Sequence, residues 1–378
     1  MSLVKANTYQ DASGGSNAVF SGVASPPNSM GFRNRIINGN MVIDQRNAGA
    51  SVTLGASLAY TLDRWAGAED TDGAATVIQD TVAPTGFTNS LKFTTTTADA
   101  SLGATQFAYV AQAIEGLNVS DLAWGTASAQ TVTLSFQVRS SLTGTFGGAI
   151  TNSAFNRSYP FTYTISAANT WETKTITIAG DTSGTWLTTN GVGMRVQFGL
   201  GVGSTYSGTA GAWAGSQFIS ATGATSVIGT LSATWQITGV QLEAGSVASP
   251  FERRDYGREL AMCQRYLPAF PVTSTNWRLP AVGLAAAGNT VFLTLTLPTT
   301  TRVPPTGMTV SSASHWVVGV DGVVGSVAFS TLSFSSLASN NAARITGTTA
   351  TGPFSTGQVV TVDSTNASAN LYFTGCEL

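Results

Sequence analysis

The sequence predicts an all-β protein, and three observations support that class. Charged residues make up only 10% of the chain, against an ordinary share of about 25%, and Gly, Thr, Ser and Ala take their place. Short segments of alternating apolar and polar residues recur with turn residues between them, which is typical of strands. One stretch alone has helical periodicity. We therefore predict an N-terminal extended arm, a large jelly-roll β-sandwich, a short helix and a smaller C-terminal β-sandwich.

Residues 1–34 form the predicted arm. The segment holds a Gly14-Gly15 pair, a Pro26-Pro27 pair and little periodicity, so it has no core of its own. We expect it to become ordered only against a partner, as an anchor. Its first 30 residues also lack the apolar region of a secretion signal.

Residues 35–253 form the predicted jelly roll. About ten strand-like segments follow one another at the spacing expected of a sandwich. Trp171 and Trp235 each begin an alternating strand, so we place both in the core. The predicted strands cover residues 41–44, 60–70, 76–82, 90–97, 105–115, 131–141, 160–166, 170–180, 193–203 and 234–245.

Residues 254–268 form the predicted linking helix. Asp255 is placed to cap its first turn, and Pro268 ends it. Four side chains at steps of four, three and four residues share one helix face: Tyr256, Leu260, Cys263 and Leu267. A helix this short needs a partner for that face. Two partners fit the spacing: the preceding sheet, or copies of the same helix around a symmetry axis.

Residues 269–378 form the predicted second sandwich, with prolines at 298, 304 and 305 marking edges and turns. The chain ends in a strand-like segment, so we expect a docked C-terminus. Cys376 lies there and Cys263 on the helix. A disulfide between them is not the default expectation.

The sequence resembles tail-fibre and receptor-binding proteins of tailed bacteriophages that carry a carbohydrate-binding-module-like jelly roll. The resemblance covers about residues 34–267. It is carried by the segments INGNMVIDQR (37–46), YTLDRW (60–65), WETKTITIAGDTSGTW (171–186) and WQITGVQLEAGSVASPFERRDYGRELAMCQRYL (235–267). The last of these is the most specific, with its VQLE, ASPFE and CQRY elements.

The resemblance implies a non-enzymatic virion protein that assembles as a homotrimer. The helix face of Tyr256, Leu260, Cys263 and Leu267 is then predicted to lie near the three-fold axis. Residues 1–34 would join other tail or adaptor proteins, and the partner outside the particle would be a host cell-surface polysaccharide. The implied location is the phage tail, assembled in the host cytoplasm.

Catalysis finds little support in the sequence. His315 is the one histidine, and no nucleophile elbow, phosphate-binding loop or zinc-protease motif is present. A glycosidase needs two facing carboxylates. The candidates lie on an early strand and its turn: Asp63, Glu69, Asp70, Asp72 and Asp80. Asp63 and Arg64 are more simply explained as an ion pair beside Trp65.

Other classes of function are also disfavoured. A formal net charge of −2 does not suit a nucleic-acid binder, and no apolar run is long enough to cross a membrane. Asp44 and Glu243 could serve a structural calcium ion, but no dense oxygen-ligand loop accompanies them. We therefore predict no metal and no cofactor.

A glycan-binding site is the better prediction, because sugar C–H faces stack on aromatic rings. The candidates in the jelly roll are Trp213, Tyr206 and Trp186, and those in the second sandwich are Trp277, Trp316 and His315. The distal sandwich is expected to touch the host, with the Trp213 loop as the rival location. Two other functions stay open: a tailspike-like glycan depolymerase, and a purely structural fibre or decoration subunit.

Overall fold

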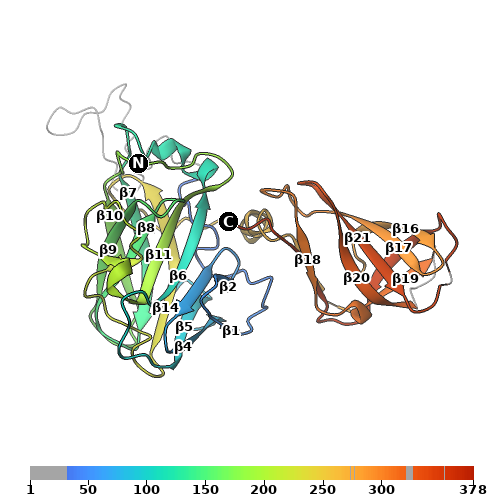
Figure 1. Cartoon of the computed structure of the whole chain (residues 1–378), viewed down its shortest axis with the longest axis horizontal. Helices are drawn as coiled ribbons and strands as arrows, with labels where there is room; N and C mark the ends of the chain where they lie inside the picture. Colours follow the sequence, from blue (N-terminus) through green and yellow to red (C-terminus); the bar gives the residue numbers. More distant parts are fainter. Residues whose placement is uncertain (1–31, 273, 276, 321–326, 353) are drawn as a thin grey trace, which may run out of the picture.

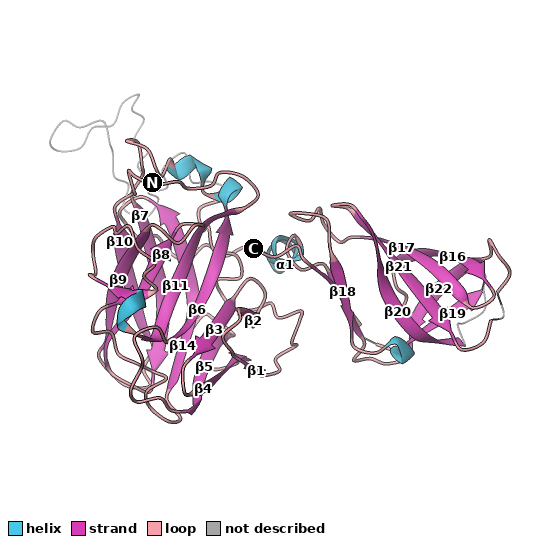
Figure 2. Ribbon diagram, in the orientation of Figure 1, coloured by secondary structure: helices cyan, strands magenta, loops and turns pink. Residues whose placement is uncertain are grey.

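The computed structural model describes residues 32–378 except 273, 276, 321–326 and 353. Most of the predicted arm, residues 1–31, therefore lies outside the described part of the chain. Two β-rich lobes lie side by side with the one helix of the described residues between them (Figure 1). Strands and loops make up nearly all of both lobes (Figure 2), which confirms the all-β class.

The first lobe is a sandwich of two six-stranded antiparallel sheets. In both sheets several neighbouring strands are far apart in the sequence, as in a jelly roll. One sheet has the order β1 (Val52–Thr53), β4 (Ala74–Asp80), β5 (Ser90–Thr97), β14 (Thr234–Ala244), β7 (Val132–Ser140), β10 (Glu172–Ile178). The other has the order β2 (Ala59–Tyr60), β3 (Ala66–Asp70), β6 (Phe107–Glu115), β11 (Val192–Val202), β8 (Gly144–Thr151), β9 (Ser158–Ile165).

The side chains between the two sheets form one large apolar core. Trp235 is fully buried there, as expected, whereas Trp171 is only half-buried. Short elements decorate the sandwich: η2 (Gly116–Asn118), η3 (Ser120–Leu122), η4 (Ser204–Tyr206), and the parallel pair β12 (Ser207–Gly208) and β13 (Ser220–Ala221).

Several details differ from the prediction. The predicted strand 60–70 is interrupted, since β2 ends at Tyr60 and β3 begins at Ala66. Residues 41–44 form no strand, because the side chain of Asn38 bonds both the N–H and the C=O of Ile43. Strand β8 was missed, because its glycines interrupt the apolar alternation. A Cβ on Gly148 would lie 2.5 Å from Cζ of Phe161, so the neighbouring ring requires a glycine there.

Helix α1 (Tyr256–Gln264) begins as predicted, with the Asp255 carboxylate accepting the backbone N–H of Arg258 at 2.9 Å. Its apolar face packs within its own chain. Cys263 lies in a cluster with Ile37 and Ile43 that continues to Tyr266, and Leu267 is also buried. The predicted contact of Cys263 and Leu267 with other copies therefore does not fit, since both are already covered.

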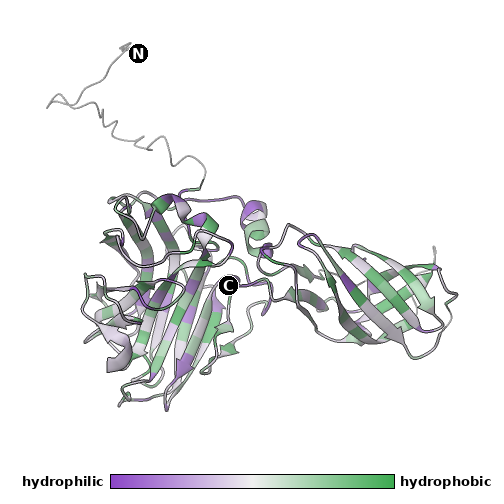
Figure 3. Cartoon of the chain, turned by 45° about the horizontal axis from the view of Figure 1, so that its top comes forward, coloured by the Kyte–Doolittle hydropathy of each residue, from purple (hydrophilic) through white to green (hydrophobic). Residues whose placement is uncertain are grey.

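The second lobe is built from a closed six-stranded barrel and a three-stranded sheet. The barrel runs β16 (Ala281–Ala287), β17 (Thr290–Thr296), β21 (Ala342–Thr349), β20 (Val327–Ala338), β19 (Trp316–Val320), β22 (Val359–Ser364). The sheet contains β15 (Ala269–Pro271), β23 (Asn370–Thr374) and β18 (Gly307–Val310), and η5 (Ala313–His315) precedes β19. The lobe has its own apolar core, and Figure 3 shows apolar residues running along its strands.

Polar contacts join the lobes around α1. Arg265 forms an ion pair with Glu115 of β6 at 2.6 Å, and Tyr266 donates its hydroxyl to the same carboxylate at 2.6 Å. The hydroxyl of Tyr60 donates to the backbone oxygen of Leu378 at 2.6 Å. The C-terminus is therefore docked, as predicted.

Candidate functional site

The outer surface of the β6–β11 sheet is only partly covered by loops. The segment 203–230 folds back over β11 and β8. A Cβ on Gly199 would lie 2.6 Å from Cβ of Ser220, so the loop lies directly on the strands there. Toward β6 the surface carries half-exposed aromatic rings instead. This uncovered part is the candidate site.

Five side chains, named here the aromatic face, make up this surface. Alternation along β6 sends Ala108 and Val110 into the core and the rings of Phe107 and Tyr109 outward. Tyr109 lies opposite Gly199 of β11, and Ala113 lies opposite Arg195, so the outward side chains of both strands share one surface. The members of the aromatic face are Phe107, Tyr109, Tyr206, Phe155 and Arg195.

The rings form a connected row. The centroids of Phe107 and Tyr109 are 5.6 Å apart, and those of Phe107 and Tyr206 are 5.8 Å apart with their planes nearly perpendicular. Alanines at 66, 68 and 111 occupy the neighbouring outward positions and are at most 6% exposed. The accessible surface therefore belongs to the rings and to Arg195.

Arg195 gives the aromatic face a fixed positive charge. Its guanidinium lies 4.2 Å from the ring centroid of Phe155 and donates to the backbone oxygens of Asn152 and Ser153 at 3.1 and 3.3 Å. Burial lowers the pKa of Arg195, and the nearby phenols of Tyr109 and Tyr60 oppose that shift. No ion pair within the described part of the chain involves Arg195.

Tyr109 keeps its proton at ordinary pH. Burial raises the pKa of its phenol, and the charge of Arg195 opposes that rise. A neutral phenol can donate and accept hydrogen bonds while its ring offers an apolar face. Rings, hydroxyls and one cation side by side suit a ligand with apolar C–H faces and many hydroxyls.

The three aromatic residues predicted to bind glycan in the jelly roll do not lie in one site. Tyr206 belongs to the aromatic face. Trp186 is 8% exposed, with its ring centroid 4.7 Å from that of Trp124, so its prediction as a ligand residue is wrong. Trp213 is half-buried at the edge of the same cluster, 5.1 Å from Tyr159, and donates its Nε1–H to the oxygen of Ala179 at 2.8 Å.

The candidates in the second lobe do not form an open site. Trp316 is fully buried in the barrel core, which contradicts its predicted role. The half-buried ring of Trp277 packs against it at 6.4 Å. The two nitrogens of His315 lie 3.1 Å from Ser311 Oγ and 3.2 Å from Asn366 Nδ2, which explains this histidine as a loop-fixing residue.

Sequence reasoning missed Phe107, Tyr109, Phe155 and Arg195. The signal was present, because the alternation in residues 105–115 already places Phe107 and Tyr109 opposite the core positions. What the sequence could not show is which side of the sheet the loop 203–230 leaves open.

Two of the carboxylates considered for catalysis serve other contacts. Asp63 is 3% exposed and accepts the backbone N–H of Gln45 at 2.7 Å rather than pairing with Arg64. The Arg64 guanidinium stacks on Tyr266 at 3.6 Å instead, so the predicted Asp63–Arg64 ion pair is wrong. Asp80 forms an ion pair with Lys92 at 3.1 Å.

The residues considered for calcium also have local partners. The Asp44 carboxylate accepts the N–H groups of Asn47 and Gly49 at 3.0 and 2.7 Å, which fixes a turn. Glu243 accepts the N–H and hydroxyl of Ser249 at 2.9 and 2.6 Å. Within the described ranges, no three His, Cys, Asp or Glu residues gather as a metal site would require.

Two further findings bear on the other predictions. Both Cys263 and Cys376 are buried free thiols. Among the described residues, no helix has the length and apolarity needed to cross a membrane.

Comparison with known proteins gave matches at the level of structure alone. No family model and no curated protein matches the sequence. The enzymatically active domain of bacteriophage CBA120 tailspike protein 4 is 11% identical, with a TM-score of 0.30 over 56% of this chain and 21% of its own. The chain thus spans about a fifth of that tailspike domain.

Two sugar-binding structures match in the same way. A family 11 carbohydrate-binding module from Clostridium thermocellum, in complex with a β-1,3-1,4-mixed-linked tetrasaccharide, is 10% identical, with a TM-score of 0.28 over 53% of this chain and 98% of its own. A putative sugar-binding protein from Bacteroides thetaiotaomicron is 12% identical, with a TM-score of 0.32 over 56% of this chain and 100% of its own. Likenesses this distant establish neither a family nor a function for this chain.

Proposed function

We propose that the aromatic face binds a cell-surface glycan and that the chain is a non-enzymatic attachment protein of a phage tail. The observation that carries the proposal is the row of half-exposed rings of Phe107, Tyr109 and Tyr206 beside the unpaired cation of Arg195. The viral setting rests on the resemblance of residues 34–267 to tail-fibre proteins. A host polysaccharide is then the natural ligand, and the virion the natural location.

The chemistry of the aromatic face suits binding rather than cleavage. A sugar ring stacked on an aromatic ring gains about 1 kcal/mol beyond its buried area, so one site of this size binds weakly. Several copies on one particle would raise the avidity by about 10²–10⁴ without new contacts. A homotrimer remains part of the proposal for that reason.

Binding to defined sugars tests the proposal. A panel of neutral bacterial surface oligosaccharides is screened, and the best binder is titrated by calorimetry into the intact chain. We expect Tyr109→Ala to weaken binding about tenfold, because one stacking platform is lost. Trp171→Ala removes a half-buried ring outside the aromatic face and serves as the matched control. Equal affinity in the folded Tyr109→Ala protein would contradict the proposal.

The depolymerase alternative makes a different prediction. If the chain cleaves its glycan, new reducing ends accumulate when wild-type protein is incubated with the purified polysaccharide. We expect none above the protein-free control. A number of reducing ends that increases with protein concentration would show that the chain is an enzyme rather than a binding protein alone.

A further inference from the structure

A second pocket lies away from the aromatic face, where the first turn of α1 meets the loop 86–88. Its volume is about 380 Å³, within the range of small-molecule sites. Phe87, Thr88, Arg253 and Tyr256 are among the residues that line it. Neither the sequence prediction nor the proposed function uses this pocket.

Arg253 supplies a fixed cation. Its guanidinium lies 4.8 Å from the ring centroid of Phe87 and 5.9 Å from that of Phe251, and it donates to the oxygen of Gly86 at 2.6 Å. These contacts hold the group in place without neutralising it. Among the ion pairs of the described residues, none includes Arg253.

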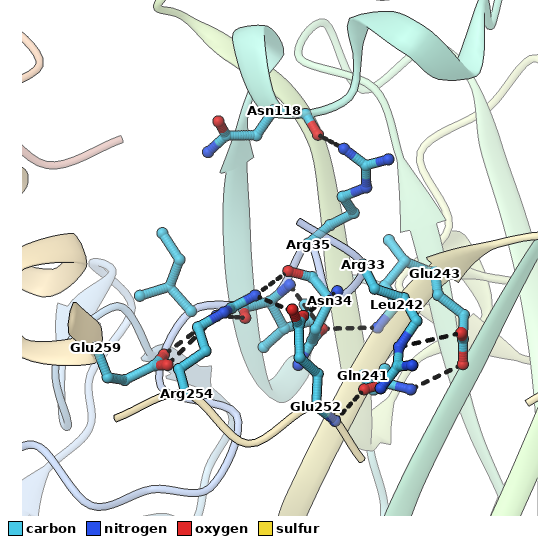
Figure 4. A network of polar contacts seen from close by, with 12 residues as sticks. Arg33, Asn34, Arg35, Asn118, Gln241, Leu242, Glu243, Glu252, Arg254 and Glu259 are labelled. Atoms are coloured by element: carbon cyan, nitrogen blue, oxygen red, sulfur yellow. Dashed lines mark hydrogen bonds and ion pairs between the residues drawn. The ribbon is translucent and has the colours of Figure 1, made fainter. Parts of the chain in front are cut away.

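The other charged side chains at the pocket already have partners within the chain. Arg254 lies 3.3 Å from Glu259 and 3.3 Å from Glu252 (Figure 4). Glu259 also accepts the backbone N–H of Asn38. Glu259 is therefore already satisfied within the chain. Arg253 is left as the charge that a ligand in the pocket can meet.

Tyr256 gives the same pocket an aromatic surface. The residue is 62% exposed, so most of its ring is open to a ligand. The hydroxyl of Thr88 donates to Oδ1 of Asn89 at 2.8 Å, and its oxygen can still accept a hydrogen bond from a sugar hydroxyl. An open ring, a hydroxyl and an unpaired guanidinium together fit a sugar that carries a negative charge.

We propose that this pocket binds an acidic saccharide, with the sugar ring against Tyr256 and its anionic group paired with Arg253. The shared chemistry is a carboxylate, sulfate or phosphate on a hexose. The pocket would add a second sugar-binding site, with its own cation, to a protein whose aromatic face carries rings and the cation of Arg195. It stands apart from the proposed function, because no residue is common to the two sites.

Titration of the intact chain with a uronic-acid tetrasaccharide tests the proposal, with a sulfated tetrasaccharide and sodium sulfate as parallel probes. We expect the acidic tetrasaccharides to bind, and Arg253→Gln and Tyr256→Ala each to weaken them about tenfold or more. Binding should also weaken as NaCl rises from about 50 to about 300 mM, because salt screens the charge pair. The better of the two acidic sugars identifies the anionic group.

The controls separate the two sites. Arg344→Gln removes a cation on the barrel that also has no ion pair among the described residues, and should leave acidic-sugar binding unchanged. Tyr109→Ala should weaken binding at the aromatic face and leave binding at this pocket unchanged. Unchanged acidic-sugar affinity in Tyr256→Ala, whose exposed ring is not needed for folding, would overturn the pocket. Sulfate binding as tightly as the acidic tetrasaccharides would also contradict the proposal, because the sugar ring would then add nothing. A lower oligomeric mass in Tyr256→Ala would contradict it too, because the pocket would then be an interface between copies of the chain.

Discussion

At the scale of single residues, two aromatic side chains show when the sequence predicts burial and when it does not. Trp316 and Tyr109 each lie in a strand, yet Trp316 is fully buried and Tyr109 faces outward. The alternation of β6 predicts the direction of Tyr109. Trp316 stands at the start of a continuously apolar strand, β19, so periodicity cannot separate its inner from its outer side chains.

Truncation of Trp316 should act on stability rather than on binding. Trp316→Ala removes a core ring and should lower the free energy of unfolding of the barrel by about 3–5 kcal/mol. Denaturant unfolding followed by circular dichroism measures the loss. If Trp316→Ala instead leaves the stability unchanged and weakens glycan binding, Trp316 is a ligand-binding residue after all.

Asp63 predicts a pH dependence with a defined sign. Burial raises its pKa to about 6, while hydrogen bonds from Gln45 oppose the rise. The folded state therefore holds this proton more tightly than the unfolded state, so the contribution of Asp63 to stability is full below pH 3.8 and falls as pH rises toward 6. The difference between a pKa of 3.8 and one of about 6 corresponds to about 3 kcal/mol of unfolding free energy.

Comparison with Asp63→Asn isolates this effect. The free energy of unfolding of the wild type, minus that of the variant, should fall between pH 4 and pH 7 by up to about 3 kcal/mol. The pH-dependent contributions of the other carboxylates are the same in both proteins, so they drop out of this difference. A difference that is constant or rises with pH would contradict the raised pKa.

At the scale of elements, regular alternation predicted most of the jelly-roll strands, and β5 was placed with both ends correct. The failures have local causes. Gly147 and Gly148 hide β8, and the side chain of Asn38 takes the backbone groups that a strand at 41–44 would need. The four-three-four spacing predicted the helix. It did not show whether the apolar face of the helix packs on its own chain or on a neighbouring copy.

The docking of α1 can be tested through its cysteine. Cys263 is fully buried, and burial raises its thiol pKa well above the ordinary value, so it should resist iodoacetamide in the native protein. Leu260→Asp places a carboxylate beside the Ile37–Ile43 cluster and should expose Cys263 to the reagent. Tyr256→Ala, on the same helix, is the control and should not. Rapid labelling of Cys263 in the native wild type would mean that α1 is not docked on its own chain.

At the scale of the whole molecule, the sequence predicted two β-rich parts, but neither the closed barrel in the second part nor the contacts between the two. Arg265 and Tyr266, which directly follow α1, meet Glu115 of the first lobe, and no spacing in the sequence joins positions so far apart. Burial would raise the pKa of Glu115, but the hydrogen bonds from Arg265 and Tyr266 outweigh it and the pKa is lowered. The stabilising contribution of Glu115 is thus present above pH 4.5 and is lost as pH falls through its lowered folded-state pKa.

Removal of the cation should weaken the junction. Arg265→Ala leaves the Glu115 side chain, which is 1% exposed, without its ion-pair partner. We expect a loss of about 3 kcal/mol in unfolding free energy at pH 7, and a smaller loss at pH 3, where the carboxylate is partly protonated. Arg278→Ala is the control, because its ion-pair partner Asp363 lies in its own lobe and Arg278 itself is exposed. Equal losses for the two variants would show that the Arg265–Glu115 pair does not hold the lobes together.

The most direct test of the central claim is the affinity of the intact chain for the immobilised surface polysaccharide of the host. Wild type is compared with a Phe107→Ala/Tyr109→Ala double variant that unfolds at the same denaturant concentration. Because two of the three rings in the row are lost, we expect the affinity to fall by about a hundredfold. Undiminished binding by the folded double variant would show that the aromatic face is not the glycan site.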